Sequence, residues 1–129
     1  MIADDDIKSA KYLFNEKIYR NVCFLCQQAV EKCLKGLLSS RNIYFPKTHS
    51  LSRLNNLLKR KKIVLGILEE DLKKLDSFYI EPRYPDAYFE TYTKKEAKEA
   101  LDMTEYIIAK IKEISKKWLL WNKKFRLRW

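Results

Sequence analysis

Residues 19–38 read YRNVCFLCQQAVEKCLKGLL and form the most clearly periodic stretch of the sequence. Apolar residues recur along one stripe at helical spacing, and polar residues fall off that stripe. The apolar stripe comprises Val22, Cys26, Ala29, Val30, Cys33 and Leu37, and the polar positions are Gln27, Gln28, Glu31, Lys32 and Lys35. The pattern predicts a long helix that buries the stripe. Gly36 lacks a neighbouring turn signal, so we interpret it as a close helix crossing or as a residue tolerated near the end of the helix.

Four other segments have helical patterns. The acids at 4–6 suit a helix N-terminus, and this first helix ends near 15–17. A third helix starts at Thr48 or Ser50 and breaks near 59–66. A fourth has Leu68, Leu72, Leu75 and Tyr79 as its apolar face and stops at Glu81–Pro82. Thr93 and Glu96 form a capping box that opens a fifth. We therefore predict an antiparallel all-α bundle with the second and fifth helices at its centre.

Composition narrows the class of protein. A chain of 129 residues is long enough for one compact domain, and two glycines with three prolines argue against an all-β domain or a glycine-rich phosphate loop. The sequence has no run of eighteen apolar residues and no secretory leader pattern. We expect a cytoplasmic protein without a membrane span, whose three cysteines are free thiols.

The formal net charge is +10, and six basic residues without an acid fall in the last fourteen positions. We interpret the excess of positive charge as lying mostly near the C-terminus. We divide the chain into a helical domain, 1–117, and a basic, tryptophan-containing C-terminal extension, 118–129. A basic surface suggests a polyanionic partner, but net charge does not specify a reaction.

Cysteines and aspartates give weak signals for a metal site. Cys23 and Cys26 have C-x-x-C spacing, yet they fall inside the second helix and lack the other ligands of a tetrahedral zinc site, so we interpret them and Cys33 as core residues. The aspartates at 4–6 point around a helix start and cannot converge on one ion. We predict no metal and no cofactor.

His49 is the only histidine in the sequence. Its imidazole is the one side chain that titrates near neutrality without a large environmental shift. The spacing leaves two interpretations open. His49 either hydrogen-bonds the loop at the start of the third helix or acts as a functional or interface residue.

Residues 81–93 carry the most informative motif, Arg83-Tyr84-Pro85-Asp86, followed by Tyr88. Arginine offers a planar fork for phosphate, and tyrosine rings can stack on bases. The alternative is that Arg83 and Asp86 pair locally while the prolines and tyrosines close the end of the bundle. The functional interpretation makes this loop a nucleotide or phosphate site.

The ordered set of QQAVEKCLK at 27–35, Thr48-His49 and Arg83-Tyr84-Pro85-Asp86 resembles the HEPN domain family (higher eukaryotes and prokaryotes nucleotide-binding). The resemblance runs from about residue 3 to 115. It implies an up-and-down four-helix core with an additional short helix and a homodimer that brings two copies of the late loop together. It also implies a partner, because prokaryotic members pair with a minimal nucleotidyltransferase or act in toxin–antitoxin pairs.

Many members of that family are metal-independent ribonucleases with an Arg-x(4–6)-His motif. No histidine follows Arg83 in this sequence. Seven residues separate Arg41 from His49, one more than the motif allows. We therefore expect a non-catalytic nucleotide- or RNA-binding module that uses Arg83, Asp86 and Tyr88, with Tyr84 stacking or supporting and His49 as an accessory residue.

Two alternatives stay open. One is a ribonuclease toxin with a non-standard active site, in which Arg83 acts with Tyr88 or with His49. The other is a structural adaptor that docks on a partner through the extension at 118–129.

Overall fold

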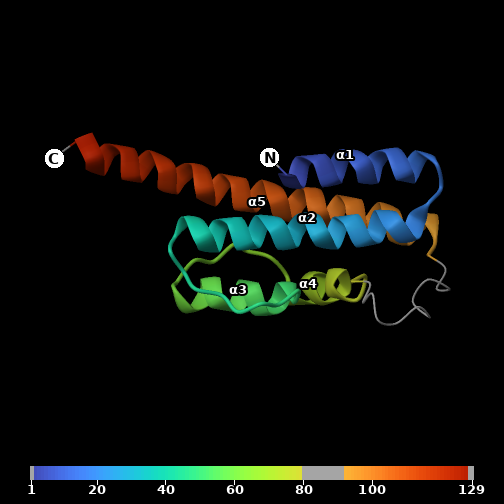
Figure 1. Ribbon diagram of the computed structural model, residues 1–129, viewed down its shortest axis with the longest axis horizontal. Coiled ribbons are helices and arrows are strands. Elements are labelled where there is room, and N and C mark those ends of the chain that lie inside the picture. Colours follow the sequence, from blue (N-terminus) through green and yellow to red (C-terminus); the bar gives the residue numbers. More distant parts are fainter. Residues whose placement is uncertain (1, 80–91, 128–129) are drawn as a thin grey trace.

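The structure, a computed structural model, describes residues 2–79 and 92–127. Its elements in these residues are five α-helices: α1 (Ile2–Asn15), α2 (Tyr19–Ser40), α3 (Leu51–Arg60), α4 (Glu69–Asp76) and α5 (Lys94–Leu127). Figure 1 shows α1, α2 and α5 as long neighbouring helices, with α3 and α4 one after the other along α2. The predicted all-α bundle is confirmed.

Ion pairs between helices fix their directions. Asp6 pairs with Lys32, and Asp4 and Lys11 pair with Lys112 and Glu105, so α1 runs antiparallel to both α2 and α5. Since both are antiparallel to α1, α2 and α5 run in the same direction. Between them the chain returns along α3 and α4 (Figure 1). This is the up-and-down arrangement, with α3 and α4 together in the place of one helix.

The core lies between α2 and the helices around it. The whole predicted stripe of α2 is buried, and Ala97, Ala100, Leu101, Ile107 and Ile111 of α5 pack against it. Two polar residues of α2 depart from the prediction: Gln27 and Glu31 lie off the apolar stripe, yet they are 0% and 6% exposed. Their burial marks the place where α2 faces the loop before α3.

Gly36 is exposed, and a Cβ added there would meet nothing within 4 Å. The close-crossing interpretation is therefore wrong, and Gly36 is a residue tolerated in the last turns of α2. The chain turns away from the helix at Asn42, whose φ of 56° lets the amide of Ile43 donate to the carbonyl of Leu38 at 3.0 Å. Asparagine tolerates this left-handed conformation better than most residues.

α4 is shorter than predicted. It ends at Asp76, and Tyr79 lies beyond it. The amides of Phe78 and Tyr79 donate to the carbonyls of Leu75 and Asp76, three residues back, so the chain leaves the helix before Pro82 could end it. Leu68, predicted on the apolar face, is 59% exposed and precedes the helix.

Asp76, the last residue of α4, caps another helix with its carboxylate. The amide of Leu51 donates to Asp76 Oδ1 at 2.7 Å, and Ser50 and Ser52 each donate to Oδ2 at 3.4 Å. Ser50 itself caps α3 by accepting from the amide of Arg53 at 3.2 Å, as predicted. Burial raises the pKa of Asp76, although these hydrogen bonds favour its charged form.

The capping box at the start of α5 is confirmed. Thr93 Oγ1 accepts from the amide of Glu96 at 3.1 Å, and Glu96 accepts in return from the amide of Thr93 at 3.3 Å. α5 then continues as a helix to Leu127, and Ile114 is the last of its residues with a described side chain that packs against the core. Within the described residues, no helix has the length and apolar character needed to cross a membrane.

Candidate functional site

A buried polar cluster on α2 forms the base of the candidate site. Gln27 and Glu31 are one helical turn apart and share a face. Gln27 Nε2 lies 3.3 Å from Glu31 Oε1 and donates to the carbonyl of His49 at 2.9 Å. Gln28 Nε2 donates to Gln27 Oε1 at 2.7 Å. The amides therefore join the middle of α2 to the residues that lead into α3.

His49 completes the cluster. Its Nδ1 lies 3.0 Å from Glu31 Oε1, while Lys35 Nζ lies 3.1 Å from the other carboxylate oxygen. An ionised carboxylate only accepts hydrogen bonds, so Nδ1 carries the hydrogen and Nε2 of the neutral ring is left as an acceptor. The side chain of Glu31 is 8% exposed and that of His49 is 46% exposed. A buried carboxylate thus orients an imidazole whose outer part reaches solvent.

Local hydrogen bonds hold His49 in this place. Thr48 Oγ1 accepts from the amide of Ser50 at 3.2 Å, and Asp76 and Ser50 fix the first turn of α3. The two interpretations of His49 therefore do not exclude each other. The residue sits in a helix-start turn, and its ring is presented to solvent.

Aromatic residues cover one side of the imidazole. The rings of His49 and Tyr79 are stacked, with centroids 4.4 Å apart and an angle of 18°. The ring of Phe24 lies 6.1 Å from that of Tyr79, and Phe78 meets Tyr92 edge-on at 5.7 Å. Tyr79 and Tyr92 are the last and first described residues on either side of segment 80–91. Tyr79 therefore contacts His49 directly, while Tyr92 packs on Phe78, the neighbour of Tyr79 in the sequence.

Four of the five predicted site residues, Arg83, Tyr84, Asp86 and Tyr88, lie outside the described residues. The fifth, His49, is stacked on Tyr79, the last described residue before that segment. Two helices separate His49 from Arg83 in the sequence, and the fold brings His49 against Tyr79, four residues before Arg83.

The cysteines belong to the core. Cys23, Cys26 and Cys33 are buried, and burial raises their thiol pKa values to about 12, 11 and 11. Protonated, buried thiols make poor nucleophiles and poor metal ligands. Within the described part of the chain, no three His, Cys, Asp or Glu residues converge on a point that could hold a metal ion.

Comparison with known proteins places this arrangement in a family. The family model described as "HEPN domain" matches residues 1–114. The chain belongs to the HEPN domain family.

Two solved structures have the same fold as this HEPN protein. The crystal structure of ST0689, described as an archaeal HEPN homologue, is 31% identical, with a TM-score of 0.65 over 86% of this chain and 89% of that one. The structure of TT1696 from Thermus thermophilus is 34% identical, with a TM-score of 0.70 over 86% of this chain and 91% of that one. A protein of Methanocaldococcus jannaschii named "Putative toxin MJ1304" is 29% identical over 88% of this chain and 84% of its own length.

This HEPN protein has a second polar surface that the motifs did not indicate. Residues 32–68 contain nine of the 27 basic residues and none of the 17 acids. The positive charge is therefore not only terminal, because this internal stretch holds more basic residues than the extension does. The run without acids is visible in the sequence, but only the fold shows that several of its members gather around α3.

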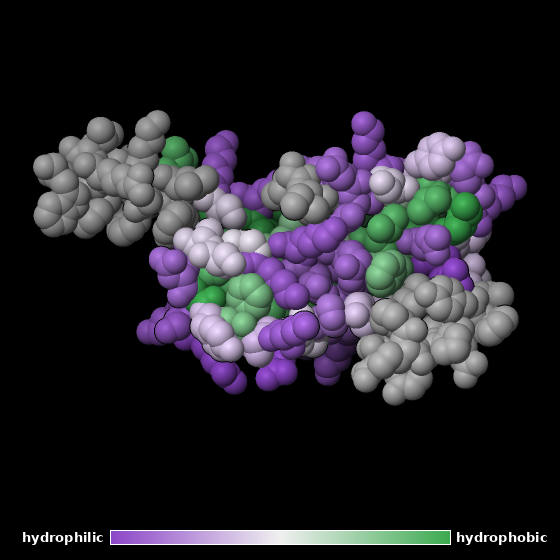
Figure 2. Space-filling model, viewed as in Figure 1, coloured by the Kyte–Doolittle hydropathy of each residue, from purple (hydrophilic) through white to green (hydrophobic). Residues whose placement is uncertain are grey.

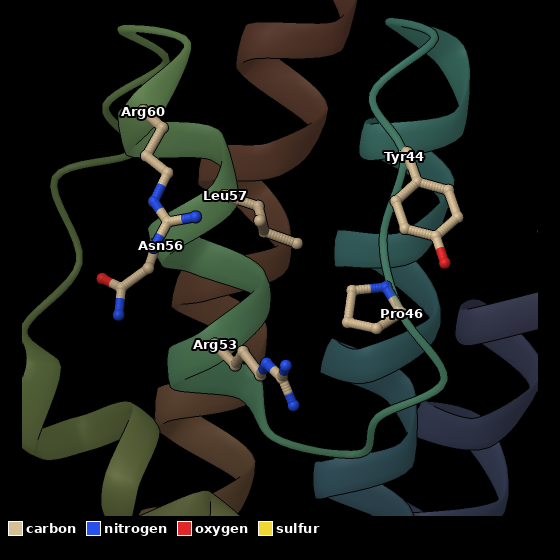
Figure 3. Close-up of a pocket in the computed structure, with 6 residues that line it drawn as sticks. All are labelled: Tyr44, Pro46, Arg53, Asn56, Leu57 and Arg60. Atoms are coloured by element: carbon tan, nitrogen blue, oxygen red, sulfur yellow. The ribbon is translucent and has the colours of Figure 1, made fainter.

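A hollow opens on that surface between α3 and the segment before it. Arg53, Asn56, Leu57 and Arg60 line it from α3, and Tyr44 and Pro46 line it from the other side (Figure 3). Its volume is about 400 Å³, and Tyr44 is 84% exposed. The α2 cluster and this hollow are joined by one loop, residues 41–50.

Proposed function

We propose that this HEPN protein binds the phosphate of a nucleotide or RNA beside His49, at segment 80–91, and does so without cleaving it. One observation carries the proposal: Tyr79, which lies four residues before Arg83 in the sequence, is stacked on the exposed imidazole of His49. A guanidinium fork supplies the strongest phosphate contact available to the chain at this place. His49 adds a hydrogen-bonding group whose position is fixed by Glu31.

Each predicted residue has a role in this proposal. Arg83 binds phosphate, Tyr88 or Tyr84 stacks on a base, and Asp86 orients Arg83 or accepts from a ribose hydroxyl. Tyr79 supports the site from below, because it is stacked on the imidazole. The aromatic floor excludes water from one side of the bound group, which strengthens charged hydrogen bonds there.

A binding subunit needs a partner to act on what it binds. We propose that the HEPN protein forms a homodimer and works with a minimal nucleotidyltransferase or within a toxin–antitoxin pair. The name of the Methanocaldococcus jannaschii relative supports the toxin context. A nucleotidyltransferase gene beside the gene for this chain, and co-purification of the two products, would support the partnership.

Replacement of Arg83 by alanine tests the site. The expected result is a loss of affinity for ATP or for a short RNA of about tenfold or more, because a charge-assisted phosphate contact is lost. Lys98→Ala is the matched control, since it also removes one positive charge, from an ion pair on α5 in which the lysine side chain is 63% exposed. Unchanged affinity of Arg83→Ala in calorimetric titration would remove this assignment.

A second function, RNA cleavage, is favoured by the Glu31–His49 hydrogen bond. With Nδ1–H held by the carboxylate, Nε2 can accept the proton of a ribose 2′-hydroxyl. The 2′-oxygen then attacks the adjacent phosphorus, the bond to the 5′-oxygen breaks, and the leaving oxygen takes a proton from water. The products are a 2′,3′-cyclic phosphate and a 5′-hydroxyl.

The ends of the RNA fragments decide between binding and cleavage. Cleavage predicts cyclic-phosphate ends with the wild-type chain and none with His49→Ala or Arg83→Ala. Equal cleavage by all three preparations would indicate a contaminating nuclease. RNA that stays intact while binding depends on Arg83 supports the non-catalytic proposal.

A further inference from the structure

The basic residues around α3 lie in a stretch of sequence that contains no acid. Several lysines on α1, α2, α4 and α5 pair with carboxylates, at distances from 2.8 to 3.2 Å. No carboxylate among the described residues pairs with the exposed cations of α3 and its flanking turns, which we call the α3 basic face: Lys47, Arg53, Lys59, Arg60, Lys61 and Lys62. Purple, hydrophilic side chains also gather along this lower edge of the molecule in Figure 2. Such a face attracts a polyanion.

The hollow gives this face a defined shape. Arg53 and Arg60 are seven residues apart, which is two turns, so both point from the same side of α3 and their Cα atoms lie about 10 Å apart along the axis. Figure 3 shows Leu57 between them and the Tyr44–Pro46 segment opposite. The hollow therefore combines two guanidinium forks, an apolar floor and an exposed aromatic ring.

This combination fits a nucleic acid strand better than the alternatives. Each guanidinium can bind a phosphate bidentately, and the face of Tyr44 can stack on a base. A mononucleotide could not engage two arginines that lie two turns apart and also reach His49, whereas a strand can. An acidic peptide would match the positive charge, but its carboxylate side chains would not stack on the exposed ring of Tyr44 as a base can.

We infer that the hollow beside α3 binds single-stranded RNA, with phosphates on Arg53 and Arg60 and a base on Tyr44. The strand continues to His49, which precedes the first residue of α3 by two positions. The inference rests on the proposed function in one respect, because it makes the ligand of that site an RNA strand that extends onto α3. The hollow and its residues are separate from segment 80–91.

The test measures binding of a fluorescein-labelled 12-nucleotide oligouridylate by anisotropy at several salt concentrations. The Arg53→Ala/Arg60→Ala double variant is expected to lose about tenfold or more in affinity, and its salt dependence should fall by about 1.4 in log–log slope, because two phosphate contacts of a single strand are lost. Equal affinity of the double variant and the wild type would overturn the inference.

Lys8→Ala/Lys11→Ala is the matched control. It also removes two positive charges, from exposed positions on α1. This helix contacts α2 and α5 and lies across the bundle from α3 (Figure 1). We expect its affinity to stay within about twofold of the wild type. Dissolved salt screens the attraction between the ligand and charges that lie more than about 10 Å from it. An equal loss in both double variants would mean attraction by net charge and no site on α3.

Tyr44 separates RNA from a merely acidic ligand. Tyr44→Ala should weaken oligouridylate binding at least about fivefold, whereas Tyr44→Phe, which keeps the ring, should bind as the wild type does. A polyglutamate peptide that binds as tightly as the RNA and loses affinity equally in the Arg53/Arg60 variant would overturn the assignment to RNA.

Arg83→Ala, measured in the same series, separates this inference from the proposed function. Loss of binding in Arg83→Ala alone would contradict the α3 site and leave the Arg83 site standing. Loss in the Arg53/Arg60 variant alone would support α3 and contradict Arg83. Loss in both is the expected result.

Discussion

Glu31 is a carboxylate at a position that a helical pattern assigns to the surface, and it is buried because three partners satisfy it. Lys35, His49 and Gln27 lie within 3.3 Å of its oxygens. A buried charge is tolerated only when it is paired and hydrogen-bonded. The cluster therefore joins α2 to the start of α3. The same contacts hold the imidazole of His49 in an orientation in which part of it is exposed to solvent.

Glu31→Ala should lower the free energy of unfolding by about 1–3 kcal/mol, because the buried amide of Gln27 and the partly exposed side chains of Lys35 and His49 lose their acceptor. Glu31→Gln should cost less, since its carbonyl oxygen can still accept from His49. Urea unfolding of the three proteins measures both changes. A Glu31→Ala protein as stable as the wild type would show that the cluster does not contribute to the fold.

Gly36→Ala should stabilise the protein by about 0.5–1 kcal/mol, because alanine loses less backbone entropy than glycine in a helix. The added methyl group meets open space. Thermal unfolding monitored by circular dichroism checks the change. A lower melting temperature would mean that this face of α2 is covered, as it would be by a partner subunit.

At the scale of elements, the loop between α2 and α3 is held more firmly than its lack of periodicity suggests. Gln27 binds its backbone at His49, and Asp76 binds the first turn of α3. Asp76 therefore acts across the fold, from the end of one helix to the beginning of another. The position of His49 depends on this cap.

Asp76→Ala should destabilise the protein by about 1–2 kcal/mol, because the amides of Leu51 and Ser52 lose their acceptor. It should also weaken RNA binding, since the turn that carries His49 loses its anchor. Ser77→Ala, one residue later, is a control that leaves the α3 cap intact. Denaturant unfolding and anisotropy measure the two effects, and a Ser77→Ala loss equal to that of Asp76→Ala would contradict the capping role.

The helices and most of the core could be predicted from the sequence, because the stripe of α2, the Ser50 cap and the Thr93–Glu96 box are local signals. The contacts that join distant segments could not. Burial of Gln27 and Glu31 depends on a loop eighteen or more residues away, and the cap that Asp76 gives to α3 joins residues 25 positions apart. His49 could be singled out from the sequence, but its place beside segment 80–91 required the stacking on Tyr79.

For the whole molecule, the charge distribution and the long α5 suggest separate roles for the bundle and the extension. Among the described side chains of α5, Ile114 is the last that packs against the core, and the helix continues to Leu127 beyond the bundle (Figure 1). The α3 basic face, in contrast, lies on the bundle itself. We therefore propose that RNA binds to the predicted domain at 1–117.

Deletion of residues 118–129 should leave the melting temperature within about 2 °C of the wild type, a shift that corresponds to well under 1 kcal/mol. The reason is that the described core contacts of α5 run only as far as Ile114, before the deleted residues. Oligouridylate binding should persist. Calorimetry and anisotropy test these points, and mass measurement in solution tests the predicted homodimer in parallel. Loss of the dimer or of partner capture on deletion would instead support the adaptor alternative.

Photocrosslinking tests the central claim, that RNA binds at the His49 end of the bundle and along α3, most directly. A 12-nucleotide RNA containing 4-thiouridine would be crosslinked to the full chain, digested with trypsin and mapped by mass spectrometry. We expect crosslinks in peptides 42–47 and 75–83, which contain Tyr44 and the Tyr79–Arg83 segment. Crosslinks confined to α1 or to the extension at 118–129 would contradict the claim.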